Sequence, residues 1–259
     1  MRLAVSTLGM PGEGVESAIE TAVRFGCEGL ELRLHPDTGV HAGLGAAERV
    51  AVREAILGRG LAVAALAGYI RISGSGPDDG VVAGLRADLE LAADLGASGV
   101  RVFPGGDDLE AARRRVRAVA DLCRERGVRV FVETHDALPT GAAVGRLLDL
   151  VDLPEVTGAI WDVLHPWRHG ETPGRTYEVL SGHLSYVQIK DAVSAQDTTP
   201  RPMGTGSVPL EDCGELLRGF EGWVSLEWER TWYPDVEPVE HVLPGARAWV
   251  SRYASRPDK

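Results

Sequence analysis

Short runs of apolar and β-branched residues alternate along the chain with longer segments that are rich in Ala, Leu and Arg. The short runs predict strands at residues 2–8, 29–34, 62–69, 99–104, 128–135, 157–165, 184–191 and 222–229. Helical patterns fill the intervals at residues 14–25, 46–59, 80–95, 109–126, 141–151, 174–180, 211–219 and 239–253. This alternation is typical of right-handed βαβ units and a parallel sheet. Eight such units in 259 residues match one TIM barrel of about 250 residues, so we predict a single (β/α)8 domain over residues 1–259.

Residues typical of turns and loops separate the predicted helices from the strands. Glycine stands shortly before a predicted strand, where the chain needs a residue with positive φ, at Gly26, Gly60, Gly96 and Gly127. Two predicted loops are long, at residues 70–79 and 192–209, and both follow strand ends. Because barrel enzymes carry their chemistry at that face, each loop is expected to be a lid or substrate loop, or else an inert surface loop.

Period-two alternation assigns polar side chains to the interior of the predicted barrel. The inward faces are Phe131, Glu133 and His135 on the fifth strand, Tyr186, Gln188 and Lys190 on the seventh, and Ser225, Glu227 and Glu229 on the eighth. Trp228 faces the helices instead. The second strand turns Glu31 and Arg33 inward, and we expect these two to pair with each other across the barrel mouth. The sixth strand is apolar on both faces until Asp162.

Carboxylates that point into a barrel are unfavourable unless they are paired or bind a metal. Glu133, Asp162 and Glu227 converge from the fifth, sixth and eighth strands, and Gln188 adds an amide oxygen from the seventh. Each residue alone is best interpreted as part of a structural ion pair. Four oxygen donors at equivalent heights on neighbouring strands could surround one hard divalent cation, and together they predict a metal site.

Composition and charge narrow the choice of partners. Hydrophobic residues make up 44% of the chain and charged residues 25%, and the formal net charge is -11. That charge argues against nucleic acid and anionic membranes as partners, because both need a basic face. Three widely spaced cysteines suit a reducing compartment, and the apolar run near the N-terminus is too brief and too polar for a signal peptide, so we expect a cytoplasmic protein. The oligomeric state stays open, with a homodimer as one option, and the arginine cluster at residues 113–117 is expected on a solvated outer face.

Four strand-end motifs resemble those of the xylose isomerase-like TIM-barrel superfamily. That group includes sugar phosphate isomerases and epimerases, inosose dehydratase and endonuclease IV. The motifs here are VETHD with Glu133, WDVLHP with Asp162 and His165, VQIKD with Gln188 and Lys190, and LEWE with Glu227. Their order and strand placement match the superfamily pattern along essentially the whole chain, which is specific for the superfamily but not for a substrate.

The resemblance implies acid–base chemistry on a small keto-sugar, polyol or sugar phosphate. In related isomerases and epimerases, a divalent metal binds two neighbouring sugar oxygens and stabilises an enediolate. Glu133 and Glu227 would then transfer the proton, and each would also be a metal ligand. The alternatives are a lyase of the inosose dehydratase kind on the same metal site, and a barrel that binds a sugar without catalysis.

The same reasoning suggests contacts to the substrate. The candidate substrate-binding residues are His165, Lys190, His135, Glu31, Arg201 and Trp228. Arg201 is the only obvious candidate for holding a phosphate. Trp228 and the nearby Trp232 could stack on a sugar face or pack against the last helix. Lys190 could instead form a structural ion pair with Glu227 or Glu229.

Two positions depart from the superfamily pattern. Gln188 stands where a His is usual, so the ligand set would be all oxygen, which favours Mn²⁺ or Mg²⁺ over Zn²⁺. This difference also counts against endonuclease IV, whose metal cluster is rich in His. Residues 203–206 lack the acidic residue that relatives often place between the glycines of this loop.

Overall fold

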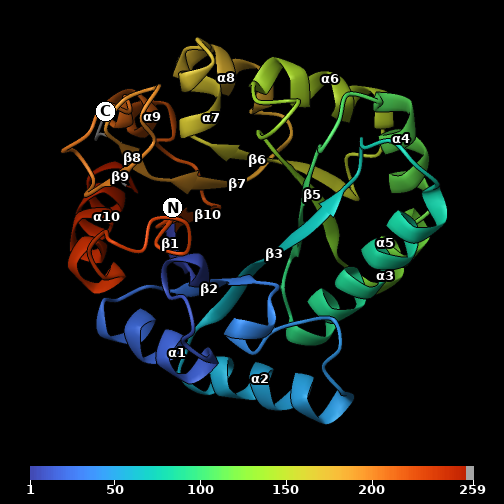
Figure 1. Ribbon diagram of the computed structural model, residues 1–259, viewed down its shortest axis with the longest axis horizontal. Helices are drawn as coiled ribbons and strands as arrows, with labels where there is room; N and C mark the ends of the chain where they lie inside the picture. The colour runs from blue at the N-terminus through green and yellow to red at the C-terminus, as the bar shows by residue number, and fades with distance from the viewer. Residues whose placement is uncertain (255–259) are drawn as a thin grey trace.

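The computed structural model describes residues 1–254 and contains a closed barrel of parallel strands inside a ring of helices (Figure 1). The barrel strands are β1 (Arg2–Ser6), β2 (Gly29–Arg33), β3 (Ala62–Arg71), β4 (Gly99–Phe103), β5 (Arg129–Glu133), β6 (Thr157–Asp162), β7 (Leu184–Ile189) and β10 (Trp223–Leu226). Strands that follow one another in sequence are neighbours in the sheet, and β10 closes the ring against β1. The predicted (β/α)8 fold is confirmed.

Helices connect the strands and cover the outside of the barrel (Figure 1). They are α1 (Val15–Arg24), α2 (Ala46–Gly58), α3 (Asp78–Leu95), α4 (Leu109–Arg117), α5 (Ala120–Arg126), α6 (Gly141–Val151), α7 (Leu164–Arg168), α8 (Pro173–Leu180), α9 (Leu210–Leu216) and α10 (Val239–Ala254), with 3-10 turns η1 (Thr7–Gly9) and η2 (Pro36–Thr38). The main apolar core lies between the helices and the outward faces of the strands. The four predicted glycine stops adopt φ values between 66° and 77°. Within residues 1–254, no helix has both the length and the apolar character needed to cross a membrane.

An apolar plug fills the N-terminal half of the barrel interior. Ala65, Phe131, Ile160 and Tyr186 form a buried cluster of their own, and the Phe131 and Tyr186 rings meet edge to face with centroids 5.8 Å apart. Buried polar or charged side chains, namely Glu133, Asp162 and Gln188, occupy the next inward positions on β5, β6 and β7. The plug thus closes one end of the barrel and leaves the carboxyl ends of the strands for chemistry.

Several element boundaries differ from the predicted ones, including those of β3, β6 and the helix predicted over residues 109–126. β3 continues to Arg71, two residues further than expected. β6 ends at Asp162, so His165 lies on the short helix α7 and not on a strand. The helix predicted over residues 109–126 is divided into α4 and α5, because Val119 has a non-helical φ of -112°.

The loop after β3 is fixed by Arg115 of α4. Its guanidinium donates hydrogen bonds to the backbone oxygens of Ile72 (2.9 Å) and Gly74 (2.7 Å) and forms an ion pair with Asp78 (2.8 Å). Arg115 is only 1% exposed. The prediction that the cluster at residues 113–117 lies on a solvated face is therefore wrong for Arg115, because the side chain turns inward to supply donors to the loop.

Candidate active site

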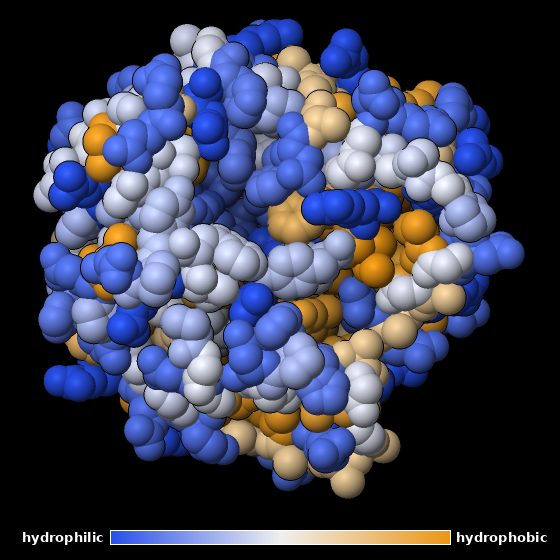
Figure 2. Space-filling view, in the orientation of Figure 1, coloured by the Kyte–Doolittle hydropathy of each residue, from blue (hydrophilic) through white to orange (hydrophobic). Residues whose placement is uncertain are grey.

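A cavity of about 380 Å³ opens at the C-terminal ends of the barrel strands. Figure 2 shows a hollow near the middle of the molecule, with mostly hydrophilic residues around it. The cavity brings together five of the predicted site residues, namely Glu133, His135, His165, Lys190 and Glu227. Its described lining includes no residue of the loop at 192–209, so that loop does not reach the cavity in the observed conformation.

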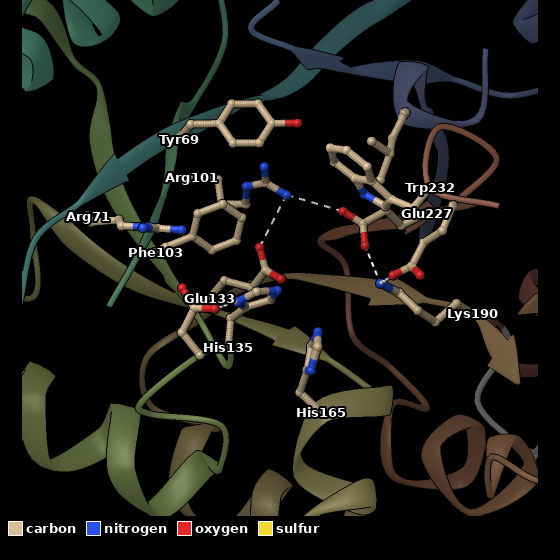
Figure 3. A pocket seen from close by; sticks show the side chains of 13 residues that line it. Tyr69, Arg71, Arg101, Phe103, Glu133, His135, His165, Lys190, Glu227 and Trp232 are labelled. Atoms are coloured by element: carbon tan, nitrogen blue, oxygen red, sulfur yellow. Dashed lines mark hydrogen bonds and ion pairs between the residues drawn. The ribbon is translucent and has the colours of Figure 1, made fainter. Parts of the chain in front are cut away.

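One arginine bridges the two predicted catalytic carboxylates (Figure 3). The Nη1 atom of Arg101, on β4, lies 3.3 Å from Oε2 of Glu133 and 3.2 Å from Oε1 of Glu227. Glu133 ends β5, and Glu227 directly follows β10. The two carboxylates therefore face each other across a single guanidinium group.

The backbone of β3 holds this guanidinium in place. Nε and Nη2 of Arg101 donate to the carbonyl oxygen of Gly68, at 3.2 and 3.1 Å. Arg101 was not predicted as a site residue, although its strand carries a usable signal: an arginine inside the apolar strand GVRVF shares a face with Phe103. The pKa of Arg101 is raised, because the surrounding carboxylates outweigh the opposing effect of burial.

A second cation, Lys190, links Glu227 to two further carboxylates. The ammonium group of Lys190 forms ion pairs with Asp162 (2.7 Å) and Glu229 (2.8 Å) and makes a close contact with Glu227. Burial opposes the charge of Lys190, but the three carboxylates raise its pKa well above the ordinary value. The predicted ion pairs of Lys190 with Glu227 and Glu229 are both present.

The floor of the site is a buried amide and carboxyl pair. Gln188 Nε2 donates to Glu31 (3.2 Å) and to Glu227 (2.9 Å), while Ser6 donates to Glu31 (3.0 Å). The expected pairing of Glu31 with Arg33 is wrong: Arg33 instead forms an ion pair with Asp37, because η2 brings this acid within 2.9 Å of its guanidinium.

Two histidines stand beside Glu133 at the cavity wall (Figure 3). The ring centroids of His135 and His165 are 4.4 Å apart, and Phe103 lies 4.4 Å from His135 on its other side. Burial lowers the pKa of His135, and it lowers the pKa of His165 well below the ordinary value, with the Lys190 charge acting in the same direction. Both imidazoles are therefore neutral at physiological pH and can bind a proton, a substrate oxygen or a metal.

Two features of the site fit a bound cation. Within the described residues, five carboxyl groups (Glu31, Glu133, Asp162, Glu227 and Glu229) surround two cations (Arg101 and Lys190). Burial, together with the neighbouring carboxylates, raises the pKa of Glu31, and it raises the pKa of Glu133 well above the ordinary value. In addition, the side-chain amide oxygen Oε1 of Gln188, although buried, accepts no hydrogen bond from the described part of the chain.

The most compact group of metal-binding atoms differs from the predicted set. Glu133, His135 and His165 place ligand atoms within 4.8 Å of one another, and this group could hold a metal ion. Of the predicted ligands Glu133, Asp162, Gln188 and Glu227, it includes only Glu133. Of the other predicted carboxylates, Glu227 pairs with Arg101 and Asp162 pairs with Lys190, and Asp162 also lies 3.7 Å from Nε2 of His165.

Three predicted substrate contacts do not line the cavity. Glu31 is fully buried, with Gln188 and Ser6 as its hydrogen-bond partners. Arg201 is exposed on β9 (Pro200–Arg201), which pairs with β8 (Asp191–Ala192) outside the barrel. Trp228 faces the helices as expected, is 2% exposed, and donates from Nε1 to the backbone oxygen of Glu237 (2.7 Å). Trp232, in contrast, lines the cavity mouth and is 56% exposed.

Comparison with known proteins agrees with this architecture. A family model described as a xylose isomerase-like TIM barrel matches residues 19–252. A putative hydroxypyruvate isomerase of Streptomyces coelicolor is 31% identical over 91 residues, which cover 34% of this chain and 31% of that relative. The match thus spans less than one third of the relative's length.

Solved structures align over almost the entire chain. The probable 3-DHS dehydratase AsbF of Bacillus anthracis has a TM-score of 0.80 at 20% identity, with 98% of this chain and 100% of that chain covered. D-psicose 3-epimerase of Clostridium cellulolyticum H10, solved with D-tagatose, has a TM-score of 0.76 at 16% identity, with 99% and 100% covered. At these identities the matches establish the fold. With the family model covering most of its length, the chain belongs to the xylose isomerase-like TIM barrel family.

Proposed function

We propose that this protein is a metal-dependent isomerase or epimerase that moves a proton next to the carbonyl group of a small keto-sugar or sugar phosphate. One observation carries the proposal: Glu133 and Glu227 face each other across the Arg101 guanidinium at an open cavity. The family membership and the names of the isomerase and epimerase relatives support the same class of chemistry.

Proton transfer would use the two carboxylates in turn. One ionised carboxylate removes the proton from the carbon beside the carbonyl, and the electron pair of the C–H bond forms a C=C bond while the carbonyl oxygen becomes an enediolate oxygen. If the second carboxylate returns a proton to the opposite face of the same carbon, the product is an epimer. If the proton returns to the former carbonyl carbon, and the hydroxyl proton of the first carbon moves to the former carbonyl oxygen, the carbonyl group moves and the product is an isomer.

The predicted cation would be held by Glu133, Asp162, Gln188 and Glu227. When bound, it would supply positive charge that stabilises the developing enediolate. This all-oxygen set favours Mn²⁺ or Mg²⁺, whereas the group of Glu133 with His135 and His165 would favour Zn²⁺ through its two imidazoles. The metal that the protein binds most tightly therefore indicates which of the two sets of ligands holds it.

The other chain residues would orient the substrate and the carboxylates. Arg101 is a positioning residue, since it fixes the separation of Glu133 and Glu227 through its own anchor on Gly68. His165 lies 3.7 Å from Asp162 and opens onto the cavity, where its neutral ring can donate to or accept from a substrate oxygen. Lys190, directly after β7, forms ion pairs with Asp162 and Glu229 and lines the same cavity, where it can reach the substrate.

A panel experiment tests this function. The enzyme, loaded in turn with Mn²⁺, Mg²⁺ or Zn²⁺, is incubated with ketoses, aldoses, inositols and hydroxypyruvate, and the products are identified by NMR. An isomer or epimer of a panel member supports the proposal. Loss of water would assign the protein to the lyases, and tight binding of a sugar without any product would leave a binding protein; either result contradicts the proposal.

A further inference from the structure

The cations of the cavity differ in whether a carboxylate of the protein neutralises them. Arg101 is paired with Glu133 and Glu227, and Lys190 is paired with three carboxylates. Arg71 also lines the cavity, yet it forms no ion pair or hydrogen bond through its side chain with any residue from 1 to 254. It is the cavity cation whose charge the described protein leaves available.

The position of Arg71 is built by the fold. Arg71 is the last residue of β3, and its main chain is paired with Phe103 at the end of β4. Gly105 follows with a φ of 64°, and a Cβ atom at that glycine would lie 2.4 Å from the Arg71 Cβ and Cγ atoms. The absence of a side chain there therefore leaves room for the stem of Arg71 against the chain.

The guanidinium lies at the cavity wall opposite the lysine. Figure 3 shows Arg71 beside Phe103 on one side of the cavity and Lys190 with Glu227 on the other. Tyr69 and Trp232, both exposed aromatic residues, line the mouth. A substrate whose reacting carbon lies between the two carboxylates could thus extend a second group toward Arg71.

We propose that Arg71 binds an acidic group of the substrate, a carboxylate or a phosphate, so that the substrate is an acidic hydroxy ketone. This inference rests on the proposed function for the identity of the reacting end. An unpaired guanidinium presents several N–H donors in a planar fork that matches the oxygens of either acid. The carboxylates deeper in the cavity would repel that acidic group and so orient the substrate with its neutral hydroxy ketone end inward.

Binding to three matched three-carbon compounds tests the proposal without requiring turnover. Dihydroxyacetone, hydroxypyruvate and dihydroxyacetone phosphate share the hydroxy ketone end and differ at the third carbon, which is neutral, a carboxylate or a phosphate. Calorimetry on the metal-loaded protein is expected to give tighter binding of one acid than of the neutral compound, by about 10-fold for one charge-assisted contact. Which acid binds tighter distinguishes a keto acid from a ketose phosphate.

Variants assign the preference to Arg71. Arg71→Gln is expected to abolish the difference between the acid and the neutral compound, and Arg71→Lys to restore part of it. Arg59→Gln serves as the matched control, because Arg59 is exposed at the end of α2, just before β3 begins and thus at the other end of the barrel.

Three results would overturn the inference: equal affinity for the acidic and neutral compounds, a preference that survives in Arg71→Gln, or no binding of either acid. The proposed function is judged separately. If neutral ketoses are converted equally well by the wild type and Arg71→Gln, the acidic substrate is rejected but the isomerase function stands. If an acid binds in an Arg71-dependent way but is not converted, the acid-binding role of Arg71 stands and the isomerase function is rejected.

Discussion

Buried carboxylates occur in two surroundings at the same end of the barrel. Asp191, the first residue of β8, is 2% exposed and accepts four backbone hydrogen bonds, from Ala192 (2.9 Å), Gly204 (2.9 Å), Gly206 (2.9 Å) and Val208 (3.1 Å). These donors all belong to the loop at 192–209. The protein itself therefore satisfies the Asp191 carboxylate, which anchors that loop.

Glu133 and Glu227 are just as buried, but their surroundings are of another kind. Their charged partners are the side chains of Arg101 and Lys190, and both carboxylates line an open cavity. Backbone donors cannot leave without unfolding a loop, whereas side-chain cations can exchange a contact with a substrate. The comparison teaches that burial of a charge does not by itself mark an active site; the nature of its partners and its access to a cavity do.

The largest expected effect is on catalysis. Glu227→Gln keeps the volume and one oxygen atom but removes the proton acceptor, so turnover should fall by about 10²–10⁴-fold, the usual value of general acid–base help. The fold should persist, because Lys190 keeps Asp162 and Glu229 as partners. Steady-state rates on a confirmed substrate and a thermal unfolding curve measure the two effects. Wild-type turnover in this variant would mean that another group, such as His165, moves the proton.

Asp191→Ala should show the opposite profile. Loss of four buried acceptor contacts should lower the free energy of unfolding by about 3 kcal/mol, since each unsatisfied buried donor costs about 1–3 kcal/mol and the losses are not additive. Catalysis by the folded fraction should fall much less than in Glu227→Gln, because Asp191 does not line the cavity. Urea unfolding and limited proteolysis of the loop measure the change. Unaltered stability would show that the loop does not depend on this anchor.

The pH dependence of kcat/KM sharpens the contrast between the two carboxylate settings. Burial raises the pKa of Glu133 while Arg101 opposes that rise, and a general base acts only when ionised. Activity should therefore decline on acidification from a pH above the range of an ordinary glutamate. Arg101→Met removes the opposing charge and should move this decline to higher pH. A decline that stays in place, or moves to lower pH, would contradict the positioning role of Arg101.

Metal selectivity is expected to change least. Asp162→Asn should weaken Mn²⁺ binding if the all-oxygen set holds the cation, and Gln188→His should raise the affinity for Zn²⁺ relative to Mg²⁺ several-fold. His135→Asn is the matched control, since His135 belongs only to the alternative group around Glu133. Calorimetry with each metal measures all three variants. If only His135→Asn weakens binding, the predicted ligand set is wrong.

Periodicity was sufficient for much of this architecture. Alternating apolar runs predicted the barrel, and period-two parity placed Glu133, Gln188 and Glu227 inward, because a half-buried strand exposes its pattern directly in the sequence. The alternation along a strand predicts which face a side chain points to, but it does not predict which residue that side chain pairs with. Arg33 pairs with Asp37 because of a 3-10 turn that no spacing rule identifies.

Other features depend on how separate elements meet in space. Arg115 looked like part of a solvated arginine run, but the path of the loop after β3 buries it. Arg101 had a signal in its strand, yet its role depends on two carboxylates that are distant in the sequence. One of them, Glu227, is 126 residues away. Contacts over such separations are set by barrel closure and not by local pattern.

The central claim is that Glu133 and Glu227 transfer a proton beside a carbonyl group. Its most direct test is NMR detection of deuterium incorporation from D₂O into a bound substrate by the metal-loaded wild type, Glu133→Gln and Glu227→Gln proteins. The account predicts metal-dependent incorporation by the wild type at the carbon next to the carbonyl, and incorporation reduced by about 10²-fold or more in at least one of the variants. Incorporation at the wild-type rate in both variants would contradict it.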